Sequence, residues 1–409
     1  MSPSYRELFS AFGRIGCLSF GGPAAQIALM EEELVSRRGW LSQEAFLRAL
    51  SFCMLLPGPE AMQLATYAGW RLKGVWGGIL AGSLFVVPGA IIIFALAALY
   101  IEFGAAPIVQ DLFLGIQATV IVIVLTALRK IAGKLEGNVG LAIAGVAFVA
   151  IFFVGVPFPL IILGAGLFGW FRAKGVSKVP PQRAPRPGLL AAIAGLWGLP
   201  IVIFWAAGAT FLLSLVLFFS QLAVVTFGGA YSVLAYMTQT VVQDFGWISA
   251  DAMIDALGLA ETTPGPLILV TQFVGVIAGH AQGGWPLAFL AGLVTLWVTF
   301  LPCFLWIFAG APYLERLTSH PRIGAALRAV TAAVVGVILS LSLFFAMHVF
   351  FGEVEPGNGN YVLPVLETFR PVAVLLTGIA GVLMLGFGRG VLTTLAVMIP
   401  ITLMVAMLA

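Results

Sequence analysis

Residues 75–101 read VWGGILAGSLFVVPGAIIIFALAALYI, an apolar run without a single charged side chain. A helix needs about 20 predominantly apolar residues to cross the hydrocarbon core of a bilayer, so this run is long enough. The rest of the chain has the same character, since 61% of its 409 residues are hydrophobic and only 9% are charged. Soluble domains carry about 25% charged residues. The composition therefore indicates an integral membrane protein.

Further apolar runs follow along the chain, separated by the glycine and proline that are common in membrane helices. They are 107–128, 139–154, 158–171, 189–206, 285–310, 323–350, 371–386 and 391–409. No series of alternating strands appears, which argues against a β-barrel. We expect an all-α, polytopic helical bundle.

Eight shorter helical stretches have glycine and proline near their ends. They are 8–20, 24–35, 44–56, 61–72, 211–227, 231–242, 251–263 and 267–278. At about 1.5 Å per residue, most of them are too short to cross a bilayer alone. We interpret them as broken helices or re-entrant hairpins.

Three short motifs occur twice, each time 207 residues further on. Phe-Gly-Gly stands at 20–22 and 227–229, Gly-Trp-Leu/Ile-Ser at 39–42 and 246–249, and Pro-Gly-Pro at 57–59 and 264–266. Between 20–59 and 227–266, about 15 of the 40 residues are identical. Unrelated apolar helices do not keep three such motifs in one register, so the chain contains two homologous halves.

The two halves differ in where they carry lysine and arginine. The short helices of the first half carry Arg37, Arg38, Arg48, Arg71 and Lys73, whereas the matching part of the second half carries Asp244, Asp251 and Asp255. Because cytoplasmic loops are rich in lysine and arginine, the halves have opposite orientations. Inverted repeats of this kind are typical of secondary transporters.

The same charge rule gives the domain organisation. We expect a first membrane repeat over 1–171, a basic cytoplasmic linker over 172–188, a connecting helix over 189–206 and a second, inverted repeat over 207–409. The N-terminus then lies in the cytoplasm, and the chain is a multi-pass protein of the cell inner (cytoplasmic) membrane.

The repeated motifs predict helix N-termini that bind an anion. Proline is favoured in the first turn of a helix, and glycine lets the backbone turn just before it. The free N–H groups of such a tip carry a partial positive charge and suit an oxyanion. The glycines that we expect to bind the substrate are Gly21, Gly22, Gly58, Gly228, Gly229 and Gly265.

Polar side chains beside these motifs complete the candidate site. They are Gln26, Glu60, Gln63, Tyr231, Thr262, Thr263 and Arg14. The two glutamines can donate hydrogen bonds to an anion. Glu60 is either a proton-binding residue coupled to the substrate or a structural helix cap. Arg14 is either a counter-charge for the substrate or a side chain that extends to the cytoplasmic surface.

Residues 12–35 (FGRIGCLSFGGPAAQIALMEEELV), 39–74 (GWLSQEAFLRALSFCMLLPGPEAMQLATYAGWRLKG) and VVTFGGAYSVLAYMTQ with GWIS and ETTPGPLILVTQFVG in the second half resemble the chromate transporter family. The match covers both halves, in the long two-domain form. The resemblance implies export of chromate from the bacterial cytoplasm, with sulfate as the usual competitor. It also implies two homologous halves of opposite topology.

Three readings of the function follow. The leading one is a secondary transporter that exports chromate by alternating access, driven by the membrane potential or a proton gradient. The others are a passive oxyanion channel of the same architecture and a flippase for lipids or another substrate. The sequence offers no phosphate-binding loop, catalytic triad or metal-ligand spacing, so we expect no enzyme activity, no cofactor and no metal. Besides chromate, the expected partners are membrane lipids but no nucleic acid, and a homodimer is compatible with the sequence.

The topology can be tested by labelling. Single cysteines placed next to Arg38 and next to Asp244, in a chain whose Cys17, Cys53 and Cys303 are replaced, should react with an impermeant reagent from opposite sides of the membrane. Labelling of both positions from one side would contradict the inverted repeat.

Overall fold

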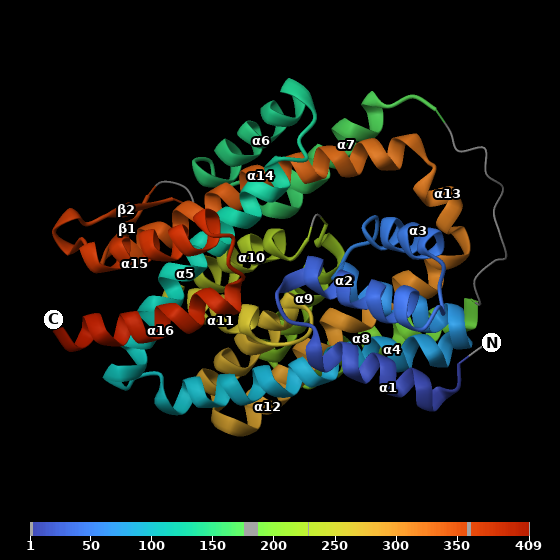
Figure 1. Cartoon of the computed structure of the whole chain (residues 1–409), viewed down its shortest axis with the longest axis horizontal. Coiled ribbons are helices and arrows are strands. Elements are labelled where there is room, and N and C mark those ends of the chain that lie inside the picture. Colours follow the sequence, from blue (N-terminus) through green and yellow to red (C-terminus); the bar gives the residue numbers. More distant parts are fainter. Residues whose placement is uncertain (1–2, 176–186, 228, 358–360, 409) are drawn as a thin grey trace. The chain divides into compact units, whose positions relative to one another are not determined.

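The structure is a computed structural model that describes residues 3–175, 187–227, 229–357 and 361–408 (Figure 1). The chain divides into two compact units. The first comprises Met1–Ala97, Ala173–Ala230 and Thr263–Gly324, and the second comprises Ala98–Arg172, Tyr231–Thr262 and Ala325–Ala409. Each unit therefore takes segments from both halves of the sequence.

The described part of the first unit is helical. It contains α1 (Tyr5–Leu18), α2 (Gly22–Glu31), a π-helical turn (Glu32–Arg37), α3 (Gln43–Cys53), most of α4 (Glu60–Phe103), α8 (Pro187–Ala206), α9 (Thr210–Val225), a 3₁₀ turn (Leu267–Leu269), α12 (Val270–Gly310), a second 3₁₀ turn (Ala311–Tyr313) and α13 (Leu314–Thr318).

The second unit is also built from helices, with one small hairpin. It contains α5 (Pro107–Ala132), α6 (Gly137–Phe152), α7 (Phe158–Arg172), α10 (Ala230–Thr238) and its π-helical extension (Gln239–Asp244), α11 (Ala250–Thr262), most of α14 (Pro321–Phe350), β1 (Val354–Pro356), β2 (Val362–Pro364), a 3₁₀ turn (Leu366–Thr368), α15 (Pro371–Gly381) with its π-helical extension (Val382–Gly386) and α16 (Val391–Leu408).

The expectation of an all-α membrane protein is confirmed. Within the described residues, five helical stretches are long and apolar enough to cross a membrane, and β1 and β2 form the only sheet. Large apolar side chains point outward, such as Phe171 (78% exposed) and Trp205 (72% exposed). An outer surface of this kind suits contact with lipid.

The two longest helices, α4 and α12, are each interrupted at a glycine. Gly74 and Gly284 both have a φ of +67°, in the left-handed region that favours glycine. After the interruption, each chain returns along its first piece. A methyl group on Gly69 would overlap the Gly77 carbonyl oxygen, and one on Gly279 would lie 2.8 Å from the Ala291 side chain. The stretches 60–72 and 270–282 are thus arms of tight helical hairpins, as the sequence predicts for these broken helices.

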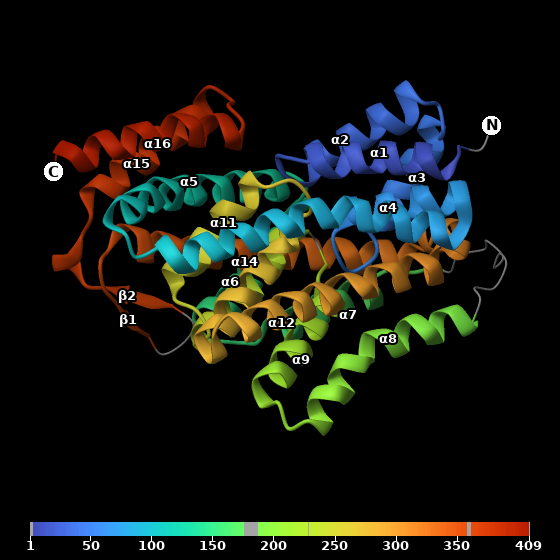
Figure 2. The same ribbon diagram turned by 90° about the horizontal axis from the view of Figure 1, so that it is seen from below.

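Close helix contacts organise each unit. In the first unit, α8 and α9 pack along α12, and the Trp297 indole N–H donates to the Leu196 carbonyl oxygen at 2.8 Å (Figure 2). In the second unit, α15 and α16 pack along α5 (Figure 2). Their shared core consists of Ala118, Val122, Leu376, Ala380 and Met398.

The predicted connecting helix is present, because α8 covers Pro187–Ala206. Most of the predicted linker 172–188 lies outside the described residues. The division of the chain into repeats over 1–171 and 207–409, and their opposite orientation in the membrane, stay predictions.

Candidate functional site

Four loops of the first unit carry the Phe-Gly-Gly and Pro-Gly-Pro motifs, and hydrogen bonds join these loops in pairs. The N–H group of Gly58 donates to the Thr226 carbonyl oxygen at 2.9 Å. The N–H group of Gly265 donates to the Ser19 carbonyl oxygen at 3.1 Å. The two bonds are equivalent, since their donors are 207 residues apart and so are their acceptors. Each Pro-Gly-Pro loop is therefore tied to the Phe-Gly-Gly loop of the other half.

The residues that accept these bonds also end their helices in the same way. The Ser19 hydroxyl donates to the Ile15 carbonyl oxygen just beyond α1, and the Thr226 hydroxyl donates to the Leu222 carbonyl oxygen just beyond α9. Both side chains are therefore engaged with the preceding turn. Their backbone carbonyls remain available to the partner loop.

The glycines of the Phe-Gly-Gly loops have the backbone conformation that the predicted tips require. Gly21, Gly22 and Gly229 have φ values of +85°, +77° and +101°. The helix α2 begins at Gly22, has Pro23 in its first turn and lacks a side-chain hydrogen bond at its N-cap. A Cβ atom built on Gly22 or Gly229 has no neighbour within 4 Å. A ligand can therefore approach the backbone closely here, whereas Gly228 lies outside the described residues.

The glycines of the Pro-Gly-Pro loops are crowded instead. A Cβ atom on Gly58 would lie 2.9 Å from the Cys303 sulfur, and one on Gly265 would lie 3.1 Å from the Leu269 side chain. Their N–H groups are the ones donated to Thr226 and Ser19. In this structure both glycines therefore join loops.

The two predicted glutamine donors also hold loops. Gln26 Nε2 donates to the Gly265 carbonyl oxygen at 2.6 Å, and Gln63 Nε2 donates to the Pro57 carbonyl oxygen at 2.6 Å. Both side chains are buried, and neither Oε1 atom has a hydrogen-bond partner. A buried acceptor without a partner is costly. These two oxygens therefore suit a ligand or water molecule that brings a donor, such as a protonated oxyanion.

The remaining candidates lie around these loops or on neighbouring helices. Glu60 is half-buried at the first position of α4, and Thr263 is buried in the loop after α11. In the second unit, the Tyr231 hydroxyl donates to the Glu261 carboxylate at 2.6 Å. The Thr262 hydroxyl donates to the Leu259 carbonyl oxygen at 2.7 Å. Substrate binding by these side chains stays a prediction.

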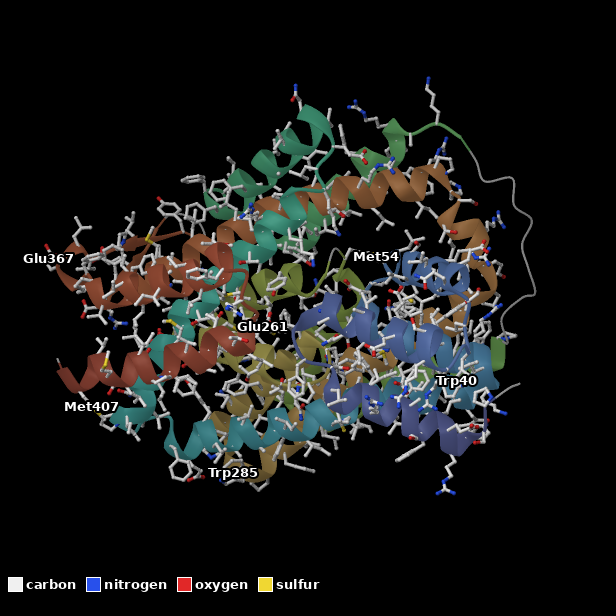
Figure 3. The ribbon with its side chains drawn as sticks, in the orientation of Figure 1. Trp40, Met54, Glu261, Trp285, Glu367 and Met407 are labelled. Carbon is white, nitrogen blue, oxygen red and sulfur yellow. The ribbon has the colours of Figure 1, made fainter. Side chains whose placement is uncertain are left out.

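Glu261 marks a difference between the halves, because Met54 occupies the equivalent position of the first repeat. Figure 3 labels both side chains. Glu261 is only 3% exposed, and it accepts a hydrogen bond from a neutral tyrosine hydroxyl. A buried acid in this environment is a functional candidate by default.

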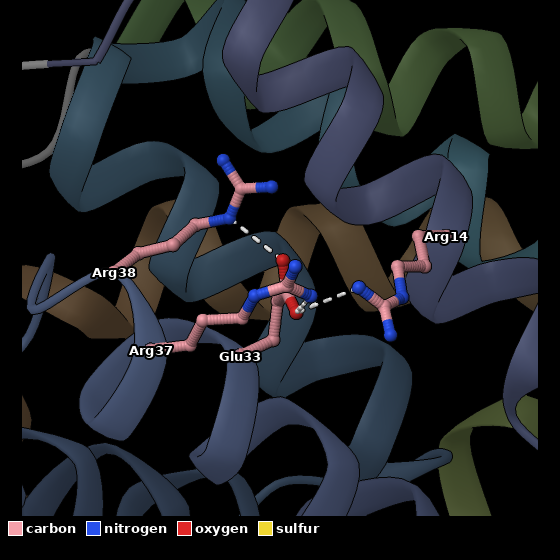
Figure 4. Close-up of polar contacts among 4 residues, drawn as sticks. All are labelled: Arg14, Glu33, Arg37 and Arg38. Atoms are coloured by element: carbon pink, nitrogen blue, oxygen red, sulfur yellow. Dashed lines mark hydrogen bonds and ion pairs between the residues drawn. The ribbon is translucent and has the colours of Figure 1, made fainter.

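Arg14 belongs to a cluster of three arginines around one buried acid (Figure 4). Glu33 accepts from Arg38 Nε at 2.7 Å and from Arg37 Nη1 at 3.1 Å, and Arg14 Nη1 lies 3.8 Å away. The Glu33 side chain is 4% exposed, whereas those of Arg14 and Arg37 are 49% and 55% exposed. We call these four residues the arginine cluster.

The arginine cluster has more positive charge than Glu33 requires. Three guanidinium groups against one carboxylate leave two positive charges, which is the amount needed to balance a tetrahedral dianion. Each guanidinium has five N–H donors, and the side chains of Arg14 and Arg37 are about half exposed. Glu33 is not among the site residues predicted from the sequence. Arg37 and Arg38, four and five residues after it, are a signal for such a cluster.

The apolar helical bundle and its paired loop motifs define a multi-pass, all-α membrane protein. A family model described as chromate transporter matches residues 6–170 and 213–366. The chain belongs to the chromate transporter family, and the resemblance seen in the sequence is confirmed.

Three relatives illustrate this membership. The chain is 32% identical to the chromate transport protein of Pseudomonas aeruginosa over 82% of its own length and 79% of that protein. It is 30% identical to the chromate transport protein of Cupriavidus metallidurans over 84% of each chain. It is also 31% identical to the uncharacterized transporter YwrA of Bacillus subtilis, where 40% of this chain covers 93% of that protein. No solved structure matches the chain.

The open glycines can be tested by substitution. Gly22→Val and Gly229→Val should abolish chromate transport while the protein remains in the membrane, because a branched side chain would fill the space beside the backbone. The positive φ alone costs roughly 1–2 kcal/mol for a residue with a Cβ atom. Transport is measured in vesicles and protein amount by immunoblotting.

Gly208→Val is the matched control. Gly208 has a φ of +64° and equally open surroundings, but it lies between α8 and α9, outside the four loops. Gly208→Val also places a β-branched residue at a positive φ, and this variant should leave transport intact. Equal transport by all three variants would exclude anion binding at the open glycines.

The arginine cluster can be tested by removing single charges. Arg14→Gln and Arg37→Gln should each raise the half-saturating chromate concentration about fivefold, since losing one nearby charge removes about 1 kcal/mol of attraction. Arg48→Gln is the control, because Arg48 is similarly exposed (53%) but pairs with Glu44 on the surface of α3. An equal effect of all three substitutions would show that only net charge matters.

Proposed function

We propose that this protein is a secondary transporter that exports chromate from the cytoplasm across the inner membrane by alternating access. The observation that carries the proposal is the equivalent pair of hydrogen bonds from Gly58 to Thr226 and from Gly265 to Ser19. A pair of this symmetry is what an inverted repeat produces around a central substrate site. Membership of the chromate transporter family supports chromate as the substrate.

The charge of chromate makes the outward direction favourable. Moving one charge across a membrane potential of 100 mV corresponds to about 2.3 kcal/mol, so an inside-negative potential favours the exit of a dianion by about twice that amount. The potential can therefore drive export alone, and a proton gradient can add to it. On the predicted topology, with the N-terminus in the cytoplasm, the arginine cluster lies on the cytoplasmic side and attracts the anion from there.

Sulfate is the expected competitor, because it has the same charge and tetrahedral shape as chromate. Hydrogen bonds from backbone N–H groups at glycine-rich helix tips recognise that shape and charge rather than the central atom. The open backbone at Gly22 and Gly229 suits an anion of this kind.

Vesicle transport tests the proposal. Inverted membrane vesicles that contain the protein should accumulate labelled chromate when an inside-positive potential is imposed, and excess sulfate should reduce the rate. Vesicles without the protein are the control. Accumulation against the chromate gradient, driven by the potential or by a pH gradient, is expected of a transporter.

The same experiment separates the alternatives. A passive channel equilibrates chromate with the potential, but an imposed pH gradient at clamped potential cannot make it accumulate the anion. A flippase moves labelled lipid and leaves chromate outside. Absence of chromate flux under every gradient would refute the proposal.

A further inference from the structure

The second unit contains a buried acid that the proposed transport site does not use. Asp255 lies in the middle of α11 and is 3% exposed. Its Oδ1 atom accepts from Gln117 Nε2 on α5 at 2.9 Å. Its Oδ2 atom accepts from the Tyr100 hydroxyl near the end of α4 at 3.0 Å. Three helices thus converge on one carboxyl group.

No cation balances this carboxyl group among the described residues. None of the ion pairs in that part of the chain includes Asp255. The contrast with Glu33 is instructive, because that equally buried acid is surrounded by three arginines. Removing an unpaired carboxylate from water is unfavourable, and two neutral donors offset only part of that cost. Binding a proton therefore removes the cost of burying the charged carboxylate.

The other titratable groups near Asp255 do not supply a positive partner. Asp251 stands one turn earlier on α11 and adds a like charge, with His348 of α14 in electrostatic range of Asp251. On α5, Asp111 is half-buried and lies six residues before Gln117. Helix α16 also packs against α11, and it has no ionisable side chain.

Asp255 is tightly packed on the side toward the end of α11. A methyl group on Gly258 would overlap the Ile116 side chain, so α11 and α5 are in close contact one turn beyond Asp255. The Tyr100 ring packs edge-on against Phe113, with ring centroids 5.2 Å apart. In the other direction, Asp251 is exposed at the start of α11. Residues four apart share a helix face, so a proton can reach Asp255 from that end.

We propose that Asp255 is a proton-binding site, at which one carboxylate oxygen takes up a proton from water and releases it again during each transport cycle. Gln117 and Tyr100 hold the carboxyl group in both states, because an amide and a phenol hydroxyl can each adapt to a charged or a neutral acid. The consequence for transport rests on the proposed function, whereas proton binding itself does not.

Asp255→Asn tests the proposal, because it keeps the shape and most of the hydrogen bonds but cannot titrate. In vesicles at clamped potential, the chromate accumulation that a pH gradient drives should be at least tenfold lower for this variant than for the unmodified protein. Transport driven by the potential should persist. Asp251→Asn is the matched control, an exposed acid on the same helix; it keeps Asp255 and should therefore retain accumulation driven by the pH gradient.

A direct measurement separates this proposal from the transport function. Infrared spectra of the purified protein should show a protonated-carboxyl band that titrates with pH, which Asp255→Asn removes and Asp251→Asn retains. Tyr100→Phe, which removes one donor, should move the titration midpoint of that band. If Asp255→Asn leaves the band and the pH-driven accumulation unchanged, Asp255 only links the helices and the proposal is wrong.

Discussion

The fold of the first unit depends on backbone hydrogen bonds between its loops. A loop at membrane depth finds no water or lipid partner for its N–H groups, and each unsatisfied buried group costs about 1–3 kcal/mol. Gly58 and Gly265 solve this by donating to carbonyls of the opposite half. The solution requires a donor loop from one half and an acceptor loop from the other. Neither half can therefore complete its own tips in this way.

The buried acids of this chain show two ways of holding a charge. Glu33 is neutralised by arginines whose exposed sides keep the excess charge available. Asp255 and Glu261 have tyrosine hydroxyls instead, and Asp255 also has an amide. An acid with cationic partners stays ionised, whereas an acid with neutral partners can change its protonation state. On the proposed function, the first arrangement attracts the anion and the second binds a proton.

Much of this structure can be predicted from the sequence, because the membrane restricts the choices. Apolar runs of spanning length predict the long helices. Gly74 and Gly284, at which α4 and α12 are interrupted, lie directly before two of these runs. The repeat predicted which loops are equivalent. The pairing of Pro-Gly-Pro with the opposite Phe-Gly-Gly loop could not be predicted, because periodicity describes single helices and not contacts between distant ones. For the same reason, the hydrogen bonds from Gln26 and Gln63 to loop carbonyls could not be predicted, and anion binding by these side chains stays a prediction.

The repeat is also less symmetric than its motifs indicate. The motifs are 207 residues apart, but the glycine interruptions at Gly74 and Gly284 are 210 apart. The three extra residues form the 3₁₀ turn Leu267–Leu269, so α4 starts directly after its Pro-Gly-Pro loop whereas α12 starts one turn later. One tip consequently carries the carboxylate of Glu60, and the other carries only buried apolar side chains. A negative charge at a helix N-terminus occupies the field that an anion would use, so the tip with Glu60 presents a weaker positive field than the tip that begins α12.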